Sequence, residues 1–398
     1  MSKKTTTDVV VIGGGVIGTA VAYFLAKCRM DVTLIERGGI ASGTSGRCEG
    51  NVLVQDKLPG FDCQLARLSQ ELFPVIAHEI DYDIKWTRKG SLLVIESGEE
   101  LEAATLFCRQ MAAEGIPVHN LDAYQVHEYE PHLAPDIVGG LEFACDGMLN
   151  PMALSQGLSS KAQRLGAVMQ TRTTVTGIRL DSAGGVCRVD TDQGSILTPR
   201  VVNAAGIWAS NIGKMIGMDI PVKPRQGQIL VSERTFQVAR RAVIEFGYLM
   251  AKFGKGDYQR NITPEMEKYG IAFVFEPTCA GNFLIGSSRQ FAEEDTTVNV
   301  HLLKAMAQRA IRFFPVLRQI QIIRSYAGLR PYTPDHFPII SETRVPGFYV
   351  AAGHEGDGIG LSLITGKLMA QIITREPTDI AIEPLRLDRF EGGTLQKN

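Results

Sequence analysis

The chain opens with the pattern that decides its fold: Asp8-Val-Val-Val-Ile12, then Gly13-Gly-Gly15-Val-Ile-Gly18, then small and apolar residues to Lys27, then Asp31-Val-Thr-Leu-Ile35-Glu36. The β-branched run at 9–12 predicts a buried parallel strand, and residues 31–35 predict a second one. The segment between them has the spacing of a helix. A strand, a glycine-rich turn, a helix and a strand within about 30 residues form a βαβ unit.

The glycine-rich turn has the features of a dinucleotide site. Gly13 allows the tight turn out of the strand, Gly15 lets a pyrophosphate approach the backbone, and Gly18 lets the helix pack closely on the sheet. The helix start, at Val16 and Ile17, presents free N–H groups and the positive end of the helix dipole to phosphates.

The residues after the second strand help to identify the dinucleotide. Glu36 is placed to accept hydrogen bonds from ribose hydroxyls, which fits NAD or FAD and disfavours NADP. Residues 37–50 read RGGIASGTSGRCEG and offer donors for a second phosphate or a flavin edge. An NAD-binding domain would more often continue with further βα units here, so FAD is favoured over an NAD(P)-linked reductase. The candidate ligands in this stretch are Arg37, Thr44, Ser45, Gly46 and Asn51.

Composition limits the class of protein. The 398 residues suit two domains. The 41 Lys and Arg nearly balance the 43 Asp and Glu, without the basic excess of a nucleic-acid binder. Seven scattered cysteines without a Cys-x-x-Cys pair argue against disulfides, zinc or an Fe–S cluster in this chain and fit a cytoplasmic protein. We expect no signal peptide and no transmembrane segment; peripheral attachment to the inner membrane through a complex stays open.

The periodicity further along the chain predicts the remaining elements. Helices are expected at 64–80, 98–114, 121–130, 151–165, 296–313 and 359–374. Strands are expected at 168–178, 186–191, 201–205, 228–232, 272–276 and 282–286, with a hairpin at 86–95 that turns near Lys89-Gly90. The rest of the C-terminal third reads as Gly-rich turns.

Three further stretches carry a family resemblance: VVNAAGIW (201–208), AGLRPYTPD (327–335) and residues 351–360, which begin AAGH. Together with the glycine motif and Glu36, they make the chain resemble the D-amino-acid oxidase superfamily of FAD oxidoreductases, from about residue 7 to 375. The resemblance implies an α/β fold in which a Rossmann-like FAD-binding domain (1–80, 143–220 and 330–398) is interleaved with an α+β substrate domain (81–142 and 221–329) built on a mostly antiparallel sheet.

Within the superfamily, SGRCEGN (45–51), GNFLIGSSRQF (281–291) and RSYAGLRPYTPDHFPII (324–340) look most like the FAD-carrying β subunits of bacterial D-hydroxyproline, opine or proline dehydrogenases. This implies a partner subunit, with an Fe–S centre as one option, and in some such complexes an FMN between the subunits. A stand-alone glycine or D-amino-acid oxidase that uses O₂, and a non-catalytic subunit that keeps FAD for assembly, are the alternatives.

The resemblance also implies a chemistry. The family transfers a hydride from the carbon next to nitrogen to flavin N5, and the protein orients the substrate. Arg330 is the expected anchor of the substrate carboxylate, because a guanidinium can form two parallel hydrogen bonds with it. His354 is expected to contact the flavin or to tune the substrate amine near neutral pH. For each of these residues a structural role is the alternative.

Further site residues follow from their place in these motifs. Tyr248 and Lys252 are expected to line the substrate pocket, and Arg289 is more easily a salt-bridge partner than a second cation. FAD is expected to be non-covalent, with Cys48 as a core thiol. The resemblance assigns the remaining contacts with the cofactor to Val175, Ala205, Gly206, Trp208, Gly353, Gly358, Ile359 and Gly360.

Overall fold

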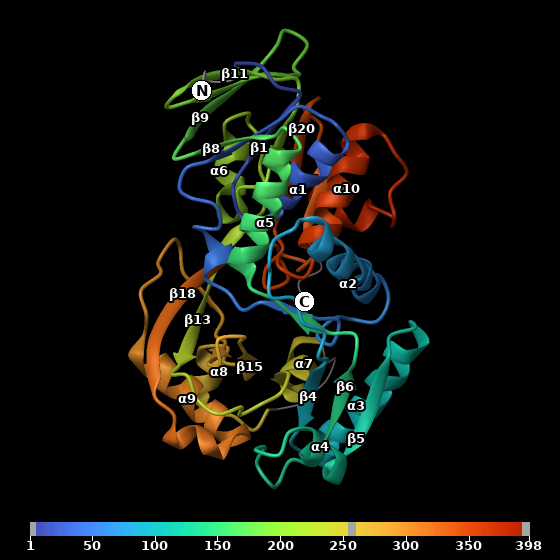
Figure 1. The fold of residues 1–398 in the computed structure, drawn as a ribbon, viewed down its shortest axis with the longest axis vertical. Helices are drawn as coiled ribbons and strands as arrows, with labels where there is room; N and C mark the ends of the chain where they lie inside the picture. Colours follow the sequence, from blue (N-terminus) through green and yellow to red (C-terminus); the bar gives the residue numbers. More distant parts are fainter. Residues whose placement is uncertain (1–4, 254–259, 392–398) are drawn as a thin grey trace.

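The computed structural model describes residues 5–253 and 260–391, without the side chains of residues 251–253. Two large sheets organise these residues, one in each half of an elongated molecule (Figure 1). The six-stranded sheet takes its strands from residues 9–36, 168–203 and 339–352, and the nine-stranded sheet from residues 91–143 and 223–332. The chain therefore crosses between the two halves several times.

The six-stranded sheet is parallel except at one edge. Its strands, in spatial order, are β19 (Ile339–Glu342), β20 (Phe348–Ala352), β12 (Val201–Asn203), β1 (Val9–Ile12), β2 (Val32–Glu36) and β8 (Val168–Thr171). β19 runs antiparallel to β20, and every other neighbouring pair is parallel. All four residues of β1 are buried, as expected for a strand covered on both faces.

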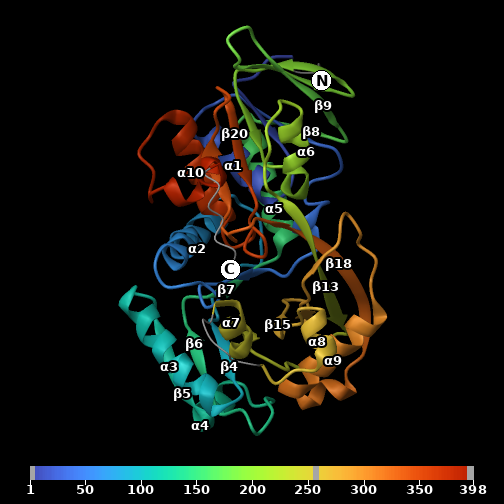
Figure 2. The ribbon, with the colours of Figure 1, turned by 180° about the vertical axis from the view of Figure 1, so that it is seen from behind.

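Three helices pack together beside this sheet. α1 (Val16–Lys27) contacts both α10 (Ser362–Thr374) and α5 (Pro151–Arg164), as Figures 1 and 2 show from opposite sides. A Cβ at Gly366 on α10 would stand 2.8 Å from the backbone of Ala20 on α1, so the glycine lets these helices approach. α5 begins at Pro151, as predicted, and the Asn150 side chain accepts the Ala153 N–H at 3.0 Å.

Two small sheets accompany the six-stranded one. β9 (Val175–Leu180), β10 (Val186–Thr191) and β11 (Gly194–Leu197) form an antiparallel sheet at one end of the molecule (Figure 2). β3 (Asn51–Val52) pairs with β7 (Gly147–Met148).

The nine-stranded sheet is antiparallel with one exception. Its strands, in spatial order, are β17 (Gln290–Phe291), β13 (Lys223–Ser232), β16 (Phe283–Gly286), β15 (Val274–Pro277), β14 (Ala242–Glu245), β4 (Ser91–Ile95), β6 (Gly139–Phe143) and β5 (Val118–Asp122), and β18 (Ile322–Tyr332) also pairs with β13. Only the β4–β14 pair is parallel within this sheet. A Rossmann-like sheet joined to a mostly antiparallel one is the predicted fold class.

The strand β18 corrects the expectation of Gly-rich turns in the C-terminal third. It pairs with β13 from Lys223 opposite Tyr332 to Ser232 opposite Ile322. Gly328 does not make a turn: a Cβ there would stand 2.5 Å from the Arg47 carbonyl oxygen, so the glycine permits a close approach of another segment. The expected domain boundary between residues 329 and 330 falls inside this strand.

Two shorter expectations are also wrong. Residues 86–95 form no hairpin, because β4 pairs with β6 and β14 while Thr87 bridges to Met148. The expected strand at 168–178 is two strands in different sheets, with Arg172 in a left-handed conformation (φ 51°) between them.

Three helices near predicted positions pack on the nine-stranded sheet: α3 (Gly98–Ala113), α4 (Ala123–Tyr129) and α9 (Val300–Phe313). The helix α2 (Phe61–Glu79) packs instead on α10. Three shorter helices complete the set: α6 (Ala209–Lys214), α7 (Phe246–Phe253) and α8 (Pro264–Lys268). Ser97 and Asn299 cap α3 and α9 with their side-chain oxygens. Phe313 of α9 stacks on Phe273 with ring centroids 4.6 Å apart, in the core between helix and sheet.

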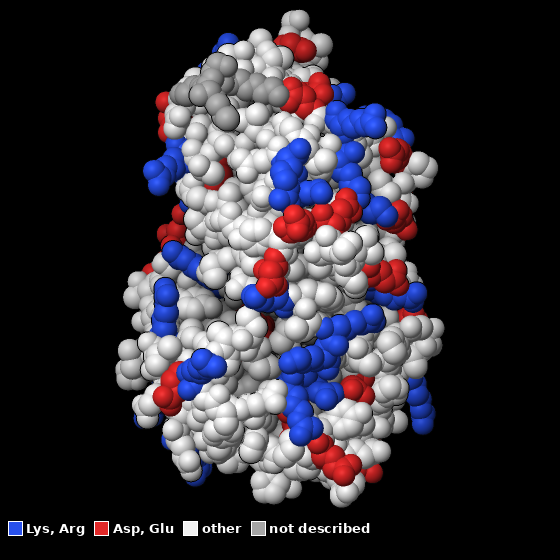
Figure 3. Space-filling model, in the orientation of Figure 1, with Lys and Arg blue, Asp and Glu red and all other residues white. Residues whose placement is uncertain are grey.

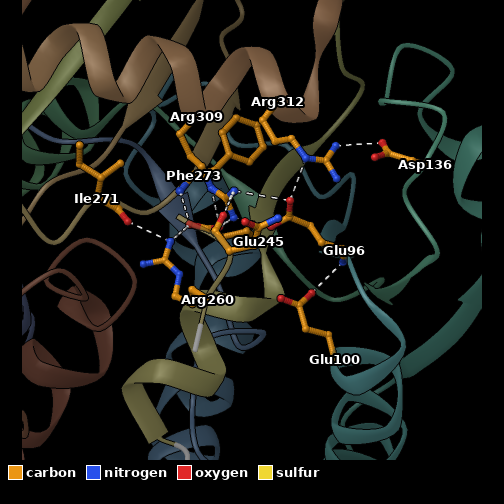
Figure 4. A network of polar contacts seen from close by, with 10 residues as sticks. Glu96, Glu100, Asp136, Glu245, Arg260, Ile271, Phe273, Arg309 and Arg312 are labelled. Atoms are coloured by element: carbon orange, nitrogen blue, oxygen red, sulfur yellow. Dashed lines mark hydrogen bonds and ion pairs between the residues drawn. The ribbon is translucent and has the colours of Figure 1, made fainter. Parts of the chain in front are cut away.

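A buried ionic network ties α9 to the sheet (Figure 4). Glu245, at the end of β14, is fully buried and contacts the guanidinium groups of Arg260 and Arg309. Arg309 also contacts Glu96, whose partner Arg312 lies nearer the surface. Because α7 begins at the residue after Glu245, the network fixes the start of that helix.

The face drawn in Figure 3 carries basic and acidic side chains in neighbouring groups, in keeping with the nearly balanced charge. Among the residues that the structure describes, no helix is long and apolar enough to cross a membrane.

Candidate functional site

A cavity of about 440 Å³ extends from the glycine turn to the nine-stranded sheet. Its size lies in the range of pockets that hold small molecules and cofactors. The predicted site residues that line it are Gly13, Gly15, Val16, Ile17, Glu36, Arg37, Thr44, Ser45, Asn51, Val175, Ala205, Gly206, Trp208, Tyr248, Arg330, His354, Gly358, Ile359 and Gly360. These residues come from distant parts of the chain, so the fold brings most of the predicted site together.

Four predicted residues are not placed in the cavity wall. A Cβ at Gly18 would stand 1.9 Å from the Gly13 carbonyl oxygen, so Gly18 lets the helix α1 lie close to the end of β1, in keeping with its expected role in helix–sheet packing. A Cβ at Gly46 would stand 2.4 Å from the Ala41 carbonyl oxygen, and a Cβ at Gly353 would stand 2.4 Å from the Thr333 side chain. Both glycines therefore allow a neighbouring segment to approach. The side chain of Lys252, on α7, lies outside the described part of the chain.

The glycine turn directs the start of α1 at the cavity. Gly13 has φ 115°, and a Cβ there would stand 2.4 Å from the Ala204 carbonyl oxygen, so glycine is required. No side chain caps α1 at Gly15. The Val16 N–H donates to Ser45 Oγ at 2.9 Å, which places a hydroxyl beside the helix start. A helix start of this kind attracts phosphate oxygens.

Glu36 closes the turn at the end of β2. Its two carboxylate oxygens accept the N–H groups of Gly14 and Gly38 at 2.6 and 2.7 Å. A carboxylate offers about four lone-pair positions, so it can accept ribose hydroxyls as well. This geometry fits the ribose role predicted from the sequence.

Arg37 and Trp208 pair at the same end of the cavity. The guanidinium carbon lies 3.7 Å from the centroid of the indole ring. The Trp208 Nε1 is buried and has no hydrogen-bond partner among the described residues. An arginine on an indole forms a flat surface against which a nucleotide can lie.

Arg330, on β18, lies at the opposite end. Its Nη1 donates to the Ser288 carbonyl at 2.8 Å, and no carboxylate of the described residues lies within 4.0 Å of it. Burial, followed by the nearby cation of Arg289, lowers the pKa of Arg330. A partly buried guanidinium that has no carboxylate in direct contact among the described residues attracts one from a ligand.

Arg289 and Tyr248 lie in the same part of the cavity wall. The Arg289 guanidinium stacks on the Tyr248 ring, 4.0 Å from its centroid, and its buried Nη1 has no partner among the described residues. The sequence favoured a salt-bridge role for Arg289, and the described residues provide no such partner. Tyr248 is on the helix α7 rather than on a strand.

His354 is a neutral, buried part of the cavity wall. Burial lowers its pKa to about 3. The Thr365 hydroxyl donates to the Leu361 carbonyl at 2.8 Å, so His354 Nε2, at 2.9 Å from that hydroxyl, is the donor to it. A ring with so low a pKa stays neutral near pH 7, which favours the expected contact with the flavin over the tuning of the substrate amine.

Acidic residues that sequence reasoning did not single out lie beside Cys48. Glu49 lines the cavity, and Glu276 accepts the Gly50 N–H at 2.8 Å. Burial and the charge of Glu49 raise the pKa of Glu276 well above its usual range. Burial likewise raises the pKa of the Cys48 thiol. Cys48 and Ser45 also border a second cavity of about 430 Å³, which Tyr326 lines. Glu49 stands in the SGRCEGN stretch, which was its only sequence signal.

The polar lining of the first cavity fits a bound FAD. Buried polar atoms of Glu49, Asn51 and Trp208 have no partner among the described residues, and all three side chains line the cavity. Buried polar groups in native proteins are normally satisfied, so such atoms indicate that a ligand completes them. The glycine turn, the helix start and Glu36 provide the groups that a dinucleotide needs.

A Rossmann-like sheet whose glycine turn opens into this cavity defines a dinucleotide-binding protein. The family model described as "DAO: FAD dependent oxidoreductase" matches residues 8–372. The chain therefore belongs to the DAO family of FAD-dependent oxidoreductases.

Individual relatives align along nearly the whole chain. A glycine oxidase of Geobacillus kaustophilus is 29% identical over 97% of both chains, and its crystal structure superposes with a TM-score of 0.85. Hydrogen cyanide synthase subunit HcnC of Pseudomonas protegens is 29% identical over 98% of both chains. An L-proline dehydrogenase from P. horikoshii superposes with a TM-score of 0.87 at 25% identity, over 99% of this chain and 100% of that one.

Proposed function

We propose that this protein oxidises the C–N bond of an amino or imino acid with FAD. The observation that carries the proposal is Arg330: a partly buried guanidinium without a carboxylate partner among the described residues, in the cavity that begins at the glycine turn. The relatives named glycine oxidase and L-proline dehydrogenase support a substrate that carries both an amine and a carboxylate.

The proposed reaction removes two electrons from the substrate. A hydride leaves the carbon next to nitrogen, the nitrogen lone pair forms the C=N bond, and the N–H proton goes to water. Water then hydrolyses an open-chain imine to a 2-oxo acid and an amine, whereas a cyclic imine opens to a single amino-carbonyl compound. FAD, when bound, supplies the hydride acceptor.

The protein's own part is to bind and orient the substrate. Arg330 holds the carboxylate by charge-assisted hydrogen bonds and fixes the position of the neighbouring carbon. His354 contributes a neutral ring to the cavity wall, and Tyr248 closes the wall beside Arg289. We also propose that Lys252, on the same helix as Tyr248, lines the substrate pocket.

We assign FAD binding to residues that line the cavity: those of the glycine turn, the 36–51 segment, Val175, Ala205, Gly206, Trp208 and the 358–360 segment. Gly18, Gly46 and Gly353 do not line the cavity, and we propose that they allow these segments to approach one another. The flavin is held without a covalent bond, and the raised pKa of Cys48 supports this because a protonated thiol is a poor nucleophile. The FAD-binding part comprises residues 1–80, 143–220 and 330–398, and the substrate part residues 81–142 and 221–329.

We further propose that the chain is the catalytic β subunit of a multi-subunit dehydrogenase for D-hydroxyproline, proline or an opine. The relative named as a hydrogen cyanide synthase subunit supports assembly with other chains. An Fe–S centre in the partner and an FMN between subunits stay predictions of the resemblance, as does a cytoplasmic location. The alternative favoured by the glycine oxidase relatives is a stand-alone oxidase that uses O₂.

The test is anaerobic reduction of the purified yellow protein by a panel of amines. The panel holds D- and L-proline, the hydroxyproline isomers, glycine, sarcosine, common D-amino acids and an opine. We expect the visible flavin band to bleach with at least one member, and Arg330→Gln to abolish this at the same concentration. Readmitted air then distinguishes an oxidase from a dehydrogenase. A protein that takes up no FAD, or one that no amine reduces even with its partner chain, contradicts the proposal.

A further inference from the structure

The substrate end of the cavity carries two guanidinium groups where one carboxylate anchor would suffice. Arg330 projects from β18, and Arg289 lies immediately before β17. Both line the cavity, and neither has a carboxylate of the described residues within 4.0 Å. Their charges act on each other, because Arg289 contributes to lowering the pKa of Arg330. Two like charges that act on each other in a partly buried wall repel, and an anion bound between them would offset this repulsion.

The nearby acidic residues do not supply that anion. The charge of Glu355 acts on Arg289 and Arg330 from a distance, but its direct partners are Arg225 at 2.5 Å and His336 at 2.8 Å. Glu49 lies beyond ion-pair distance of both guanidinium groups, and its single charge cannot balance two. The buried position of Glu276 favours its neutral form.

The backbone holds Arg289 in this position. Its N–H donates to the Tyr269 carbonyl at 3.0 Å, and the next residue, Gln290, pairs with Gln226 on β13. The guanidinium lies flat on Tyr248, which leaves the edges of the group free to donate. One of those edges is the buried Nη1 that lacks a partner among the described residues.

From this arrangement we infer that Arg289 is a second anion anchor and that the substrate is an amine with two carboxylate groups. Arg330 binds the carboxylate next to the oxidised carbon, and Arg289 binds the one on the other substituent of the nitrogen. This inference rests on the proposed function, within which it selects opine-like amino diacids over proline, glycine and other mono-acids. A buried charge-assisted contact is worth on the order of ten- to a hundredfold in binding.

A matched pair of substrates tests the inference. Iminodiacetate and sarcosine share the N–CH₂–COO⁻ unit, and only iminodiacetate has the second carboxylate. Two-electron oxidation and hydrolysis of iminodiacetate yield glyoxylate and glycine. We expect the FAD-loaded protein to be reduced by iminodiacetate with a kcat/KM at least about tenfold above that for sarcosine. In Arg289→Gln that preference disappears through a raised KM for iminodiacetate, and Arg289→Lys restores part of it.

A binding measurement separates this inference from the proposed function. Thiodiacetate and methylthioacetate carry sulfur in place of the amine nitrogen, so they bind without amine oxidation and can be titrated calorimetrically. Tighter binding of thiodiacetate that is lost in Arg289→Gln supports the second anchor even if no amine reduces the flavin. Equal binding of the two acids, or an equal loss of both in the variant, overturns it. Arg324→Gln removes an exposed charge outside the cavity and serves as the control.

Discussion

Gly227 on β13 lies against the guanidinium of Arg330 on β18: a Cβ at Gly227 would stand 2.2 Å from Nη1 and 2.5 Å from Cζ. The residue opposite Gly227 in the strand pair is another glycine, Gly328. The two strands thus leave bare backbone where the flat guanidinium lies. The carbonyl of Ser288 fixes the group from the other side.

Gly227→Ala should therefore push the guanidinium of Arg330 out of place while leaving the strand pair intact. A misplacement of about 1 Å can cost on the order of a hundredfold in rate, and we expect a loss of that size in kcat/KM. The measurement is steady-state kinetics on the best substrate together with thermal unfolding. Gly185→Ala is the control, because its Cβ would have ordinary contacts at 3.6 Å. Unchanged kinetics in Gly227→Ala would show that Arg330 does not anchor the substrate.

Glu36→Gln should weaken FAD binding. The carboxylate accepts two backbone N–H groups and has lone pairs left for ribose, whereas a glutamine would turn an N–H₂ group toward one of these donors. We expect the Kd for FAD, titrated into apoprotein by flavin fluorescence, to rise about ten- to a hundredfold. Glu342→Gln, at an exposed ion pair, should leave it unchanged. An unaltered Kd in Glu36→Gln would rule out the ribose role.

Glu355 should make the protein sensitive to acid. Burial alone would raise its pKa, but His336 and Arg225 outweigh burial and hold the pKa at about 2, below the usual 4.5. A depressed pKa stabilises the fold above pH 4.5, and this contribution is lost as the pH falls through about 2. The full effect is about 3 kcal/mol. We expect Glu355→Gln to unfold at lower urea concentration than wild type at pH 7. The difference between the two urea midpoints should become smaller below pH 4.5. A difference that is the same at all pH values would contradict this pKa.

Arg309 and Arg312 should differ sharply in their effect on stability. Arg309→Met leaves the buried carboxylates of Glu245 and Glu96 short of a partner, and breaking such a pair costs about 3–5 kcal/mol. Arg312→Met removes a more exposed pair and should cost about 1 kcal/mol or less. Urea unfolding measures both. Similar losses would mean that the network in Figure 4 is not the rigid support of β14 and α7.

The parts of the site that could be predicted from the sequence are those encoded locally. The turn at Gly13, the start of α1 and Glu36 belong to one βαβ unit, so their spacing alone specifies their geometry. Arg330 was found through its motif, which is a resemblance and not a physical derivation.

The remaining parts depend on strand pairing between distant residues. The contact of Gly227 with Arg330, and the position of Arg289 on Tyr248, arise only when β13, β17 and β18 align in register. Periodicity does not encode this register, and Gly328 resembles a turn residue although it lies in a strand. The neutral state of His354 likewise follows from burial, which a motif does not reveal.

The unsatisfied polar atoms around the cavity also affect how long the chain survives. A ligand that binds only the native state adds its binding free energy to the stability of that state. Buried polar atoms of Asn51 and Trp208 have no partner among the described residues, so we expect a bound flavin that completes them to raise the free energy of unfolding and to slow proteolysis. The flavin supply of the cell would therefore set the abundance of this protein as well as its activity.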